Sequence, residues 1–403
     1  MTEQNQSSQQ DVLGQENKFC LVMIVRDEAP VIQRCLTSVS TIATSYLICD
    51  TGSNDDTINI INQYMTSKNI PGEVITKEWK NFGYNKSYLM EQAHKRSMAK
   101  YIFFLDADEV FTKSGDAYNN VETEHSLYPN EADSQRLYEY LESKPLVNVF
   151  YLTTKFDGLE YQRWNIVRNN QLYRWDYPVH ELLVATVNDS NDVNGINFFH
   201  LRARKQGNSS RNPQRYLNDA KQFEEYLAEH PGEPRCLFYL AQTYEGIDKR
   251  KAIENYIKRL DAAGYYQEKY IALLRLGRLV DDKLEKVRWW NRAIDFIPSR
   301  LEAYHELINV YHHTFKNNHI AYGYVKAAPA SREPDRDSLF TEKPTYDWKF
   351  DLDASLVCHY GGYHEDAYKI GKSILDRKRY PDNQQSLLTN NMNFYIQKWN
   401  PML

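Results

Sequence analysis

The chain has 403 residues, enough for two or three domains with a large buried core. Its formal net charge of −5 comes from 49 basic residues scattered among 54 acidic ones, so no positive stripe exists for a nucleic-acid backbone to follow. No apolar run approaches the roughly 18 residues that a membrane helix needs, and the longest is Phe19–Val25. The sequence therefore predicts no transmembrane segment and no nucleic-acid partner.

The first sixteen residues and the cysteines bear on the compartment. Residues 1–16 are rich in Gln, Ser and Asn and lack a basic flank or an apolar core, so we expect a disordered tail and not a signal peptide. The cysteines are odd in number and widely spaced, and several adjoin apolar segments where a free thiol behaves as a small hydrophobe. They are Cys20, Cys35, Cys49, Cys236 and Cys358. We therefore expect reduced cysteines and a cytoplasmic protein.

Four apolar segments in the first 105 residues alternate with helical patterns, which predicts βαβ units and a mainly parallel sheet. The segments are Phe19–Val25, Tyr46–Asp50, Glu73–Glu78 and Tyr101–Leu105. Ligands of open α/β sheets bind at the edge where the carboxyl ends of the strands meet. The polar residues that follow the strands should converge at that edge, and they are Arg26–Glu28, Asp50, Trp79–Asn81 and Asp106–Glu109.

The segment Tyr101–Leu105 ends abruptly in a group of carboxylates. Asp106 and Asp108 lie two residues apart, so both side chains can lean to the same side of the backbone. Two hard oxygen ligands so placed suit Mg²⁺ or Mn²⁺ holding a diphosphate. An acidic cluster after a strand can also be a helix N-cap or a solvated turn, and the order of the preceding elements is what favours the metal site.

The rest of the first half should complete the sheet. Residues 115–143 are polar, with one helix expected near Ala132–Leu141. Apolar character returns further on, in segments that we expect to form strands and a short helix closing the sheet, followed by a last strand that ends in a histidine. These segments are Val147–Leu152, Trp164–Trp175, Tyr177–Val184 and Ile196–His200.

From about Asn212 onward, helix formers dominate the sequence. Two helix pairs, Cys236–Leu260 and Tyr270–Phe296, lie about 34 residues apart, the period of tetratricopeptide repeats. Repeat stacks offer extended concave surfaces, so the helical half should bind acceptor, partner or a second copy of the chain, with a homodimer as one outcome. The expected domains are a tail (1–16), an α/β domain (17–211), helical repeats (212–330) and a C-terminal helical extension (331–403).

Six motifs, in order between about residues 18 and 205, resemble family 2 glycosyltransferases of the GT-A fold. They are Met23–Glu28, Cys49–Thr57, Trp79 with Asn81–Gly83 and Asn85, Leu105–Glu109, Arg168–Asn170 and Val179–Glu181. The resemblance implies a Rossmann-like α/β GT-A domain with a mainly parallel sheet, followed by an all-α tetratricopeptide-like domain.

The resemblance implies a nucleotide pocket and a metal ligand. Asp50 is similar to the family's uracil and ribose contact, although it could equally cap the following helix. Glu28 and Arg26 would line the same pocket, unless they are solvated loop charges. Asp106 and Asp108 match the Asp-x-Asp motif, in which the second aspartate usually ligates the metal and the first acts through ribose or water.

The same resemblance implies further contacts. His200 is similar to a histidine that these folds often supply as another metal ligand. The basic run Arg202, Arg204 and Lys205 could neutralise diphosphate or be solvated. The family usually has a basic residue before the asparagine matched here by Asn85, whereas this chain has Tyr84 there. The nucleotide-sugar contacts expected in addition to Arg26, Glu28, Asp50 and Asp106 are Asn81, Asn85, Lys86, Arg168 and Arg202.

The pair His180–Glu181 follows Tyr-Pro-Val, so a turn presents two titratable groups together. Inverting transfer needs a base that takes the acceptor's proton, and a carboxylate with a slightly raised pKa suits that role. We favour Glu181 as the base; His180 could orient it, ligate the metal in place of His200, or be the base itself. Gln171–Trp175 also matches a motif of processive polysaccharide synthases, which we discount because those enzymes combine it with membrane helices.

The sequence thus predicts a metal-dependent inverting glycosyltransferase that moves a hexose from a UDP-sugar to a glycan or other hydroxyl acceptor, with Mn²⁺ or Mg²⁺ as cofactor. One alternative is a peptide glycosyltransferase, including one that forms Cys S-linkages. Another is a non-catalytic interaction protein with repeats and a vestigial GT-A domain. The expected partners are a UDP-sugar and a glycan, peptide or lipid-linked acceptor.

Overall fold

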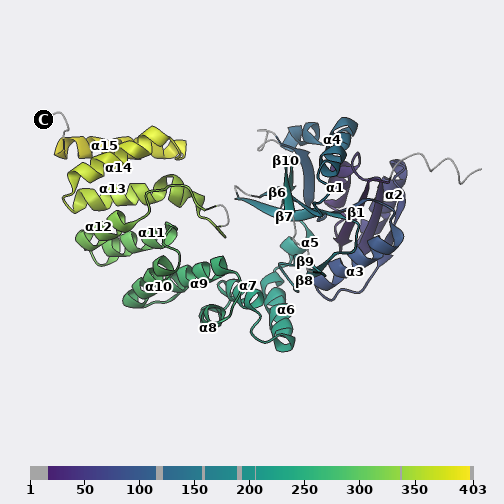
Figure 1. Cartoon of the computed structure of the whole chain (residues 1–403), viewed down its shortest axis with the longest axis horizontal. Helices are drawn as coiled ribbons and strands as arrows, with labels where there is room; N and C mark the ends of the chain where they lie inside the picture. The colour runs from purple at the N-terminus through teal and green to yellow at the C-terminus, as the bar shows by residue number, and fades with distance from the viewer. Residues whose placement is uncertain are drawn as a thin grey trace, which may run out of the picture. The chain divides into compact units, whose positions relative to one another are not determined.

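The computed structural model describes residues 17–114, 121–156, 159–187, 193–204, 206–335 and 338–399, so the expected tail 1–16 and Lys205 lie outside the described residues. The chain divides into two compact units, Met1–Gln222 and Phe223–Leu403 (Figure 1). The first unit holds the strands and the second is helical.

The first unit is built around an eight-stranded mixed sheet, with the strand order β3-β2-β1-β4-β7-β6-β10-β5. Its strands are β1 (Phe19–Val25), β2 (Ser45–Asp50), β3 (Gly72–Thr76), β4 (Tyr101–Phe104), β5 (Glu109–Lys113), β6 (Val149–Phe156), β7 (Leu159–Arg168) and β10 (Val193–Ala203). Strands β1 to β4 run parallel, whereas β7 is antiparallel to both β4 and β6, and β5 is antiparallel to β10. The expected α/β class with a mainly parallel sheet is confirmed.

Helices α1 (Ile32–Val39), α2 (Thr57–Ser67) and α4 (Glu131–Glu142) cover one face of the sheet, and α3 (Phe82–Arg96) covers the other. Strand β1 shows why both faces of the sheet are covered by helices: side chains of a strand point alternately to the two faces, and those of β1 are apolar on both. Phe19, Leu21 and Met23 pack with α1 and α2, while Cys20 and Val22 pack with α3. A strand buried on both faces therefore reads as a continuous apolar run.

Two short strands, β8 (Tyr173–Asp176) and β9 (Leu182–Ala185), form a separate antiparallel pair that packs on the α3 face. The expectation that this region completes the main sheet is confirmed for β7 but wrong for β8 and β9, and the described residues 159–187 contain no helix. Tyr177 and His180 have φ of 73° and 52°, in the left-handed region that interrupts a right-handed helix. Residues 177–181 therefore form a turn that connects β8 to β9. The described part of this unit also contains η1 (Val121–Leu127) and α5 (Asn208–Arg211).

The second unit is a series of helices that Figure 1 shows packed one on another in chain order. Helix α6 leads into them from the first unit, and the three-residue 3₁₀ turn η4 (Asp382–Gln384) precedes the last. The elements are α6 (Arg215–Glu229), α7 (Pro234–Tyr244), α8 (Lys249–Asp261), α9 (Tyr266–Leu279), α10 (Lys283–Phe296), α11 (Glu302–Asn309), η2 (Val310–Thr314), α12 (Asn318–Ala327), η3 (Thr345–Lys349), α13 (Phe350–Tyr360), α14 (His364–Arg377) and α15 (Gln385–Lys398). The repeat is visible in the starts of α7 and α9, at 234 and 266, and of α8 and α10, at 249 and 283.

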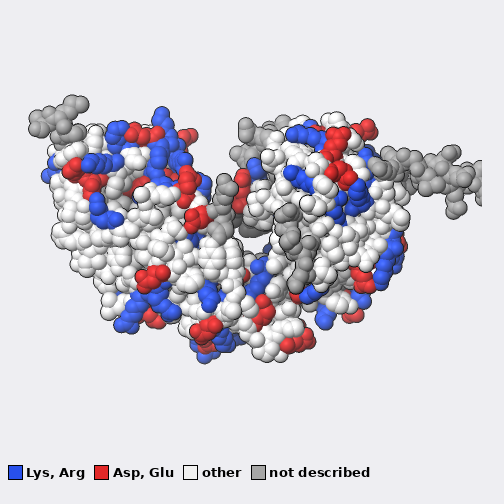
Figure 2. Space-filling view, in the orientation of Figure 1, with Lys and Arg blue, Asp and Glu red and all other residues white. Residues whose placement is uncertain are grey.

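The surface and the cysteines agree with the composition. Figure 2 shows acidic and basic side chains intermixed on the visible face of each unit. All five cysteines are buried with free thiols. None of the helices in the described ranges combines the length and the apolar character that crossing a lipid bilayer requires.

Candidate active site

The carboxyl end of β4 presents an exposed carboxylate above a buried one. After Phe104 the chain turns through Asp106 and Asp108 directly into β5, which begins at Glu109. The Asp106 N–H donates to Glu109 Oε2 at 3.1 Å, and this hydrogen bond stabilises the turn from within. The side chain of Asp106 is 43% exposed and that of Glu109 only 2%. Asp106 is thus available to a ligand, and Glu109 lies beneath it.

Two cations contact Asp106. Lys86 Nζ lies 3.4 Å from its Oδ1, and Arg163 Nη2 lies 2.8 Å from its Oδ2. Burial alone would raise the pKa of Asp106, but Lys86 and then Arg163 outweigh burial and hold it well below its usual range. Asp106 is therefore a carboxylate at every pH at which the protein would work.

Asp108 and Glu28 are less well compensated. Asp108 Oδ2 accepts the Gly207 N–H at 3.1 Å, and no lysine or arginine in the described ranges forms an ion pair with it. Burial and then the charge of Asp106 raise the pKa of Asp108. Glu28 accepts the Asn208 N–H at 2.9 Å, and burial raises its pKa to about 7. Burial is the largest cause of both shifts; the charge of Asp106 adds to it at Asp108, whereas Glu28 has a cationic partner in Arg211 at 3.7 Å.

Carboxylates outnumber cations in this cluster, and all of its acidic ligands are hard oxygens, which suits a divalent cation. The carboxylates are Glu28, Asp106, Asp108, Glu109 and Glu181, and the cations are Lys86, Arg163 and Arg211. The described residues hold no group of three or more His, Cys, Asp or Glu arranged to enclose a metal by themselves. Mg²⁺ needs no such cage, since it is commonly bound by one or two carboxylates together with substrate phosphates.

Lys86 also reaches Glu181, with its Nζ 2.5 Å from Glu181 Oε1, and lies 5.2 Å from the centre of the Trp175 ring. The structure therefore brings together Asp106, Lys86 and Glu181 from three separate segments. Burial alone would raise the pKa of Glu181, but Lys86 outweighs burial and lowers it. The slightly raised pKa that we associated with this residue is therefore not found, because the sequence could not show its lysine partner.

Hydrogen bonds from the first turns of α3 hold the Glu181 loop in place. The Gly83 N–H donates to Tyr177 O at 3.1 Å, and a Cβ at Gly83 would lie only 2.3 Å from that oxygen, so a glycine is required there. Ser87 Oγ donates to Trp175 O at 2.6 Å and accepts the Trp175 N–H at 2.8 Å. His180 is exposed beside Glu181, with a left-handed backbone. The first turns of α3 thus fix both Lys86 and the loop that carries its partner.

Asp50 does not cap the following helix, which begins at Thr57, but forms the turn directly after β2. It is 2% exposed, and its oxygens accept the N–H groups of Gly52 at 3.0 Å and Ser53 at 3.1 and 3.2 Å. These bonds stabilise the turn after β2, where Gly52 has φ of 105°. Arg26, at the end of β1, is half exposed and lies next to Asp27.

Asn81 and Asn85 have structural contacts instead of the expected nucleotide contacts. Asn81 caps α3, because its side chain accepts the Tyr84 N–H at 2.8 Å. Asn85 is fully buried: its Oδ1 accepts the N–H groups of Lys80 and Asn81, and its Nδ2 donates to Glu78 O. Asn85 thus stabilises the loop before α3, and the nucleotide contact expected of it has no support in this geometry.

Arg168 lies at the wrong end of the sheet for the expected nucleotide contact. It pairs with Tyr101, at the start of β4, and its guanidinium donates to the carbonyl oxygens of Val147, Leu141 and Lys144. The physical reason is that β7 runs antiparallel to β4, so the end of β7 meets the beginning of β4. The corrected role of Arg168 is to fasten the α4–β6 connection.

His200 and Arg202 are not brought to the acids either. In the β10–β5 ladder, Leu201 and Phe111 face the α1 core, so His200 and Arg202 face the opposite side of the sheet. Glu109 has the same parity as Phe111 and therefore faces away from His200. Burial and the charges of Lys155 and Arg202 lower the pKa of His200 to about 4, and no carboxylate contributes to that shift. The metal-ligand expectation for His200 and the diphosphate expectation for Arg202 thus have no geometric support.

Two residues of β7 that were not expected from the sequence lie at the cluster. Arg163 bridges Asp106 and Glu109. Tyr161, two residues earlier on the same face, is 44% exposed, and burial together with the charges of Glu109, Asp106 and Asp108 raises its pKa. The signal that could have found them is the Asp-Gly pair at 157–158 between two strand-like segments, which indicates a β-hairpin and hence an antiparallel β7.

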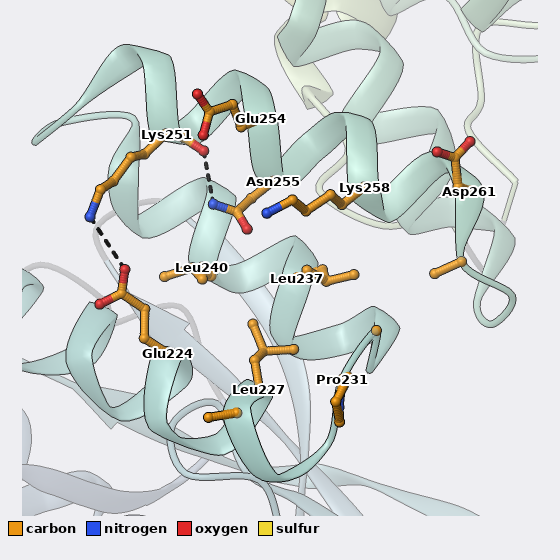
Figure 3. A pocket seen from close by; sticks show the side chains of 13 residues that line it. Glu224, Leu227, Pro231, Leu237, Leu240, Lys251, Glu254, Asn255, Lys258 and Asp261 are labelled. Atoms are coloured by element: carbon orange, nitrogen blue, oxygen red, sulfur yellow. Dashed lines mark hydrogen bonds and ion pairs between the residues drawn. The ribbon is translucent and has the colours of Figure 1, made fainter.

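The second unit contains a cavity of about 680 Å³ formed by α6, α7 and α8 (Figure 3). Leu227, Leu237 and Leu240 form an apolar floor, and polar side chains of α8 line the opposite wall. Lys251 is paired with Glu224 at 3.3 Å across one end of the cavity.

Residues 20–121 match the family model described as "Glycosyl transferase family 2". The chain therefore contains an N-terminal family 2 glycosyltransferase domain, and the resemblance inferred from the sequence motifs is confirmed.

Among curated proteins, the chain is similar to the SPbeta prophage-derived glycosyltransferase SunS of Bacillus subtilis (strain 168) and to glycosyltransferase SunS of Bacillus phage SPbeta. Each is 24% identical over 241 residues, which is 59% of this chain and 51% of the relative. The chain therefore spans about half the length of the curated relatives it matches.

Among solved structures, residues 1–349 of S. aureus TarS in complex with UDP-GlcNAc are 13% identical, with 69% of this chain and 88% of that chain covered and a TM-score of 0.36. MamA is 20% identical, with 42% and 91% covered and a TM-score of 0.33.

Proposed function

We propose that this protein is a metal-dependent inverting glycosyltransferase that moves a hexose from a UDP-sugar to a hydroxyl acceptor such as a glycan. The observation that carries the proposal is the link from Asp106 through Lys86 to Glu181. Lys86 connects Asp106, at the edge of the sheet where ligands bind, to Glu181 on a separate loop. Glycosyl transfer requires one group near the donor diphosphate and a second group that takes the acceptor's proton, and Asp106 and Glu181 could fill these two roles.

Asp108 is the residue best suited to bind Mn²⁺ or Mg²⁺. Both oxygens of Asp106 already face cations, whereas Asp108 has no ion pair among the described residues. The excess of carboxylates supports the same assignment, since a divalent ion would offset it. A bound metal would neutralise charge on the departing diphosphate.

Glu181 would act as the base. Its lowered pKa keeps it ionised at neutral pH, ready to accept the proton of the acceptor hydroxyl as that oxygen attacks the anomeric carbon. The bond from the anomeric carbon to the diphosphate oxygen breaks in the same step, so no covalent enzyme intermediate is needed. Lys86 is placed to stabilise negative charge on both sides of this step.

A peptide acceptor, including one modified on cysteine, is the second candidate. It is favoured by the cavity in the second unit, whose apolar floor and charged wall match the mixed side chains of a peptide better than a carbohydrate. In either case we propose that the helical domain, residues 212–330 with the extension 331–403, binds the acceptor or a partner.

The test is a panel of nucleotide sugars incubated with Mn²⁺ or Mg²⁺ and scored for UDP release, with glycan and peptide acceptors analysed by mass spectrometry. We expect release that requires a UDP-sugar and the metal. Calorimetry that detects no metal-dependent binding of UDP would instead favour a non-catalytic protein whose helical unit carries the function.

A further inference from the structure

Arg163 forms a closed arrangement with the two acids at the turn after β4. Its Nη2 lies 2.8 Å from Asp106 Oδ2, and its Nη1 donates to Glu109 Oε1. The other oxygen of Glu109 accepts the backbone N–H of Asp106 at 3.1 Å. Both the backbone and the side chain of Asp106 are therefore tied to the same pair of residues. A planar guanidinium fork suits this task because its nitrogens lie in one fixed plane.

The burial of these groups separates their roles. Glu109 is nearly inaccessible and can act only on its neighbours, while Asp106 is the more exposed of the two carboxylates. A buried carboxylate is costly unless it is paired, so the contact with Arg163 offsets the cost of keeping Glu109 there. The arginine in turn has both terminal nitrogens directed at carboxylates. What the arrangement controls is the direction of the Asp106 carboxylate.

The strand register explains why an arginine of β7 arrives here. Phe103 pairs with Ile166 in the antiparallel β4–β7 ladder. Arg163 lies three residues before Ile166 on β7, beyond a register irregularity between Ile166 and Trp164, and Asp106 lies three residues after Phe103, in the turn that follows β4. The antiparallel direction of β7 therefore brings Arg163 to the carboxyl end of β4.

We propose that Arg163 is a positioning residue of the donor site, which holds the Asp106 carboxylate in one orientation by anchoring it to the buried Glu109. This inference rests on the proposed function, because Asp106 must contact the nucleotide sugar for its orientation to matter. Lys86 contacts the other oxygen of Asp106 and is free of Glu109, so it cannot replace the anchor.

The test compares Arg163→Met and Arg163→Lys with Arg174→Met, a control that removes an exposed arginine of β8 paired only with Asp176 at 3.3 Å in the described structure. We expect Arg163→Met to raise the donor KM and the Kd for UDP with Mn²⁺ by about tenfold, the scale of lost supports of a binding site. Arg163→Lys should recover part of the loss, since a lysine can reach one carboxylate but not both. The control should leave both constants unchanged.

A double variant tests whether Arg163 affects UDP affinity through Asp106 or by contacting the donor directly. In an Asp106→Asn background, Arg163→Met should add no further loss of UDP affinity, because the residue that it positions is already altered. A further tenfold loss in that background would mean that Arg163 contacts the donor itself, and would overturn the inference. An unchanged KM and Kd in folded Arg163→Met would also overturn it.

The outcomes also separate this inference from the proposed function. A wild-type protein that neither binds UDP nor releases it from any nucleotide sugar removes the function and the inference together. A wild-type protein that does both, beside an Arg163→Met variant with the same constants, removes the inference alone. If circular dichroism shows that Arg163→Met is unfolded, Arg163→Lys decides by the same two constants.

Discussion

The two ends of the β4–β7 strand pair carry the same kinds of residues but differ in how their charges are matched. At the amino end of β4, Arg168 contacts three carbonyl oxygens and Glu142, and it packs over Tyr101. At the carboxyl end, Arg163 faces Asp106 and Glu109 within a cluster in which carboxylates are in excess. At the amino end the arginine is fully engaged in structural contacts, whereas the excess of carboxylates at the carboxyl end would allow a cation and a ligand to bind.

The difference teaches that an arginine beside a carboxylate does not by itself mark a functional site. What distinguishes the carboxyl end is that Asp108, whose pKa is raised by burial and by the charge of Asp106, has no ion pair among the described residues. Such imbalance costs stability and is expected where a ligand supplies the missing charge. Variants at the two ends should therefore separate activity from stability.

The largest effect is expected from Asp108→Ala. Loss of the proposed metal ligand should lower turnover by about 1000-fold or more, since metal ions contribute several kcal/mol of transition-state stabilisation. The melting temperature should not fall much, because the variant also removes a carboxylate that Asp106 repels. UDP release and thermal unfolding measure the two quantities. Turnover close to wild type would show that the excess charge at this end serves no metal.

Glu181→Gln should lower kcat by about 100-fold or more while sparing UDP affinity, because the amide cannot take the acceptor's proton. Steady-state kinetics and calorimetry with UDP check the two halves of this prediction. His180→Gln is the matched control on the neighbouring exposed residue. A normal kcat in Glu181→Gln, or a matching loss in His180→Gln alone, would move the base away from Glu181.

Lys86→Met should change the pH dependence of the reaction. Lys86 lowers the pKa of Glu181, so Glu181 stays ionised at pH values below the usual carboxyl range. The Lys86–Glu181 ion pair therefore stabilises the fold above that range, and this stabilisation is lost as the pH falls through the lowered pKa. Without the lysine, the acid limb of kcat/KM should move up by about one pH unit. Lys86→Arg, which keeps the charge, should retain the wild-type limb. An unshifted limb in Lys86→Met would mean that another group titrates in it.

The smallest functional effect is expected at the opposite end of the strand pair. Arg168→Met should destabilise the first unit by about 2 kcal/mol, since it removes three hydrogen bonds to carbonyl oxygens and an ion pair with Glu142. This corresponds to a fall of about 5 °C in melting temperature. The UDP affinity of the folded protein should be unchanged. A tenfold loss of affinity without a change in melting would assign Arg168 to the site after all.

Much of the fold was readable from local patterns. Strands Phe19–Val25 and Tyr101–Phe104 and the helices from α6 to α12 follow from apolar runs and helical periodicity, because burial on a strand or helix face imposes its own spacing. The path from β8 to β9 was not readable. Tyr177 and His180 adopt the left-handed conformation although neither is a glycine, the residue type that would have indicated such a turn in the sequence.

The sequence by itself determined that acids follow β4 at the ligand-binding edge of a parallel sheet, since that outcome depends only on the order of strands and on the residues that end them. Tertiary structure alone decided which cations meet those acids. Pairing depends on the direction and register of strands distant in the chain, so an antiparallel β7 brought Arg163 to Asp106 and took Arg168 away. The alternation of side chains across β10 likewise turned His200 away from Glu109, and the packing of α3 on the β8–β9 turn brought Lys86 to Glu181.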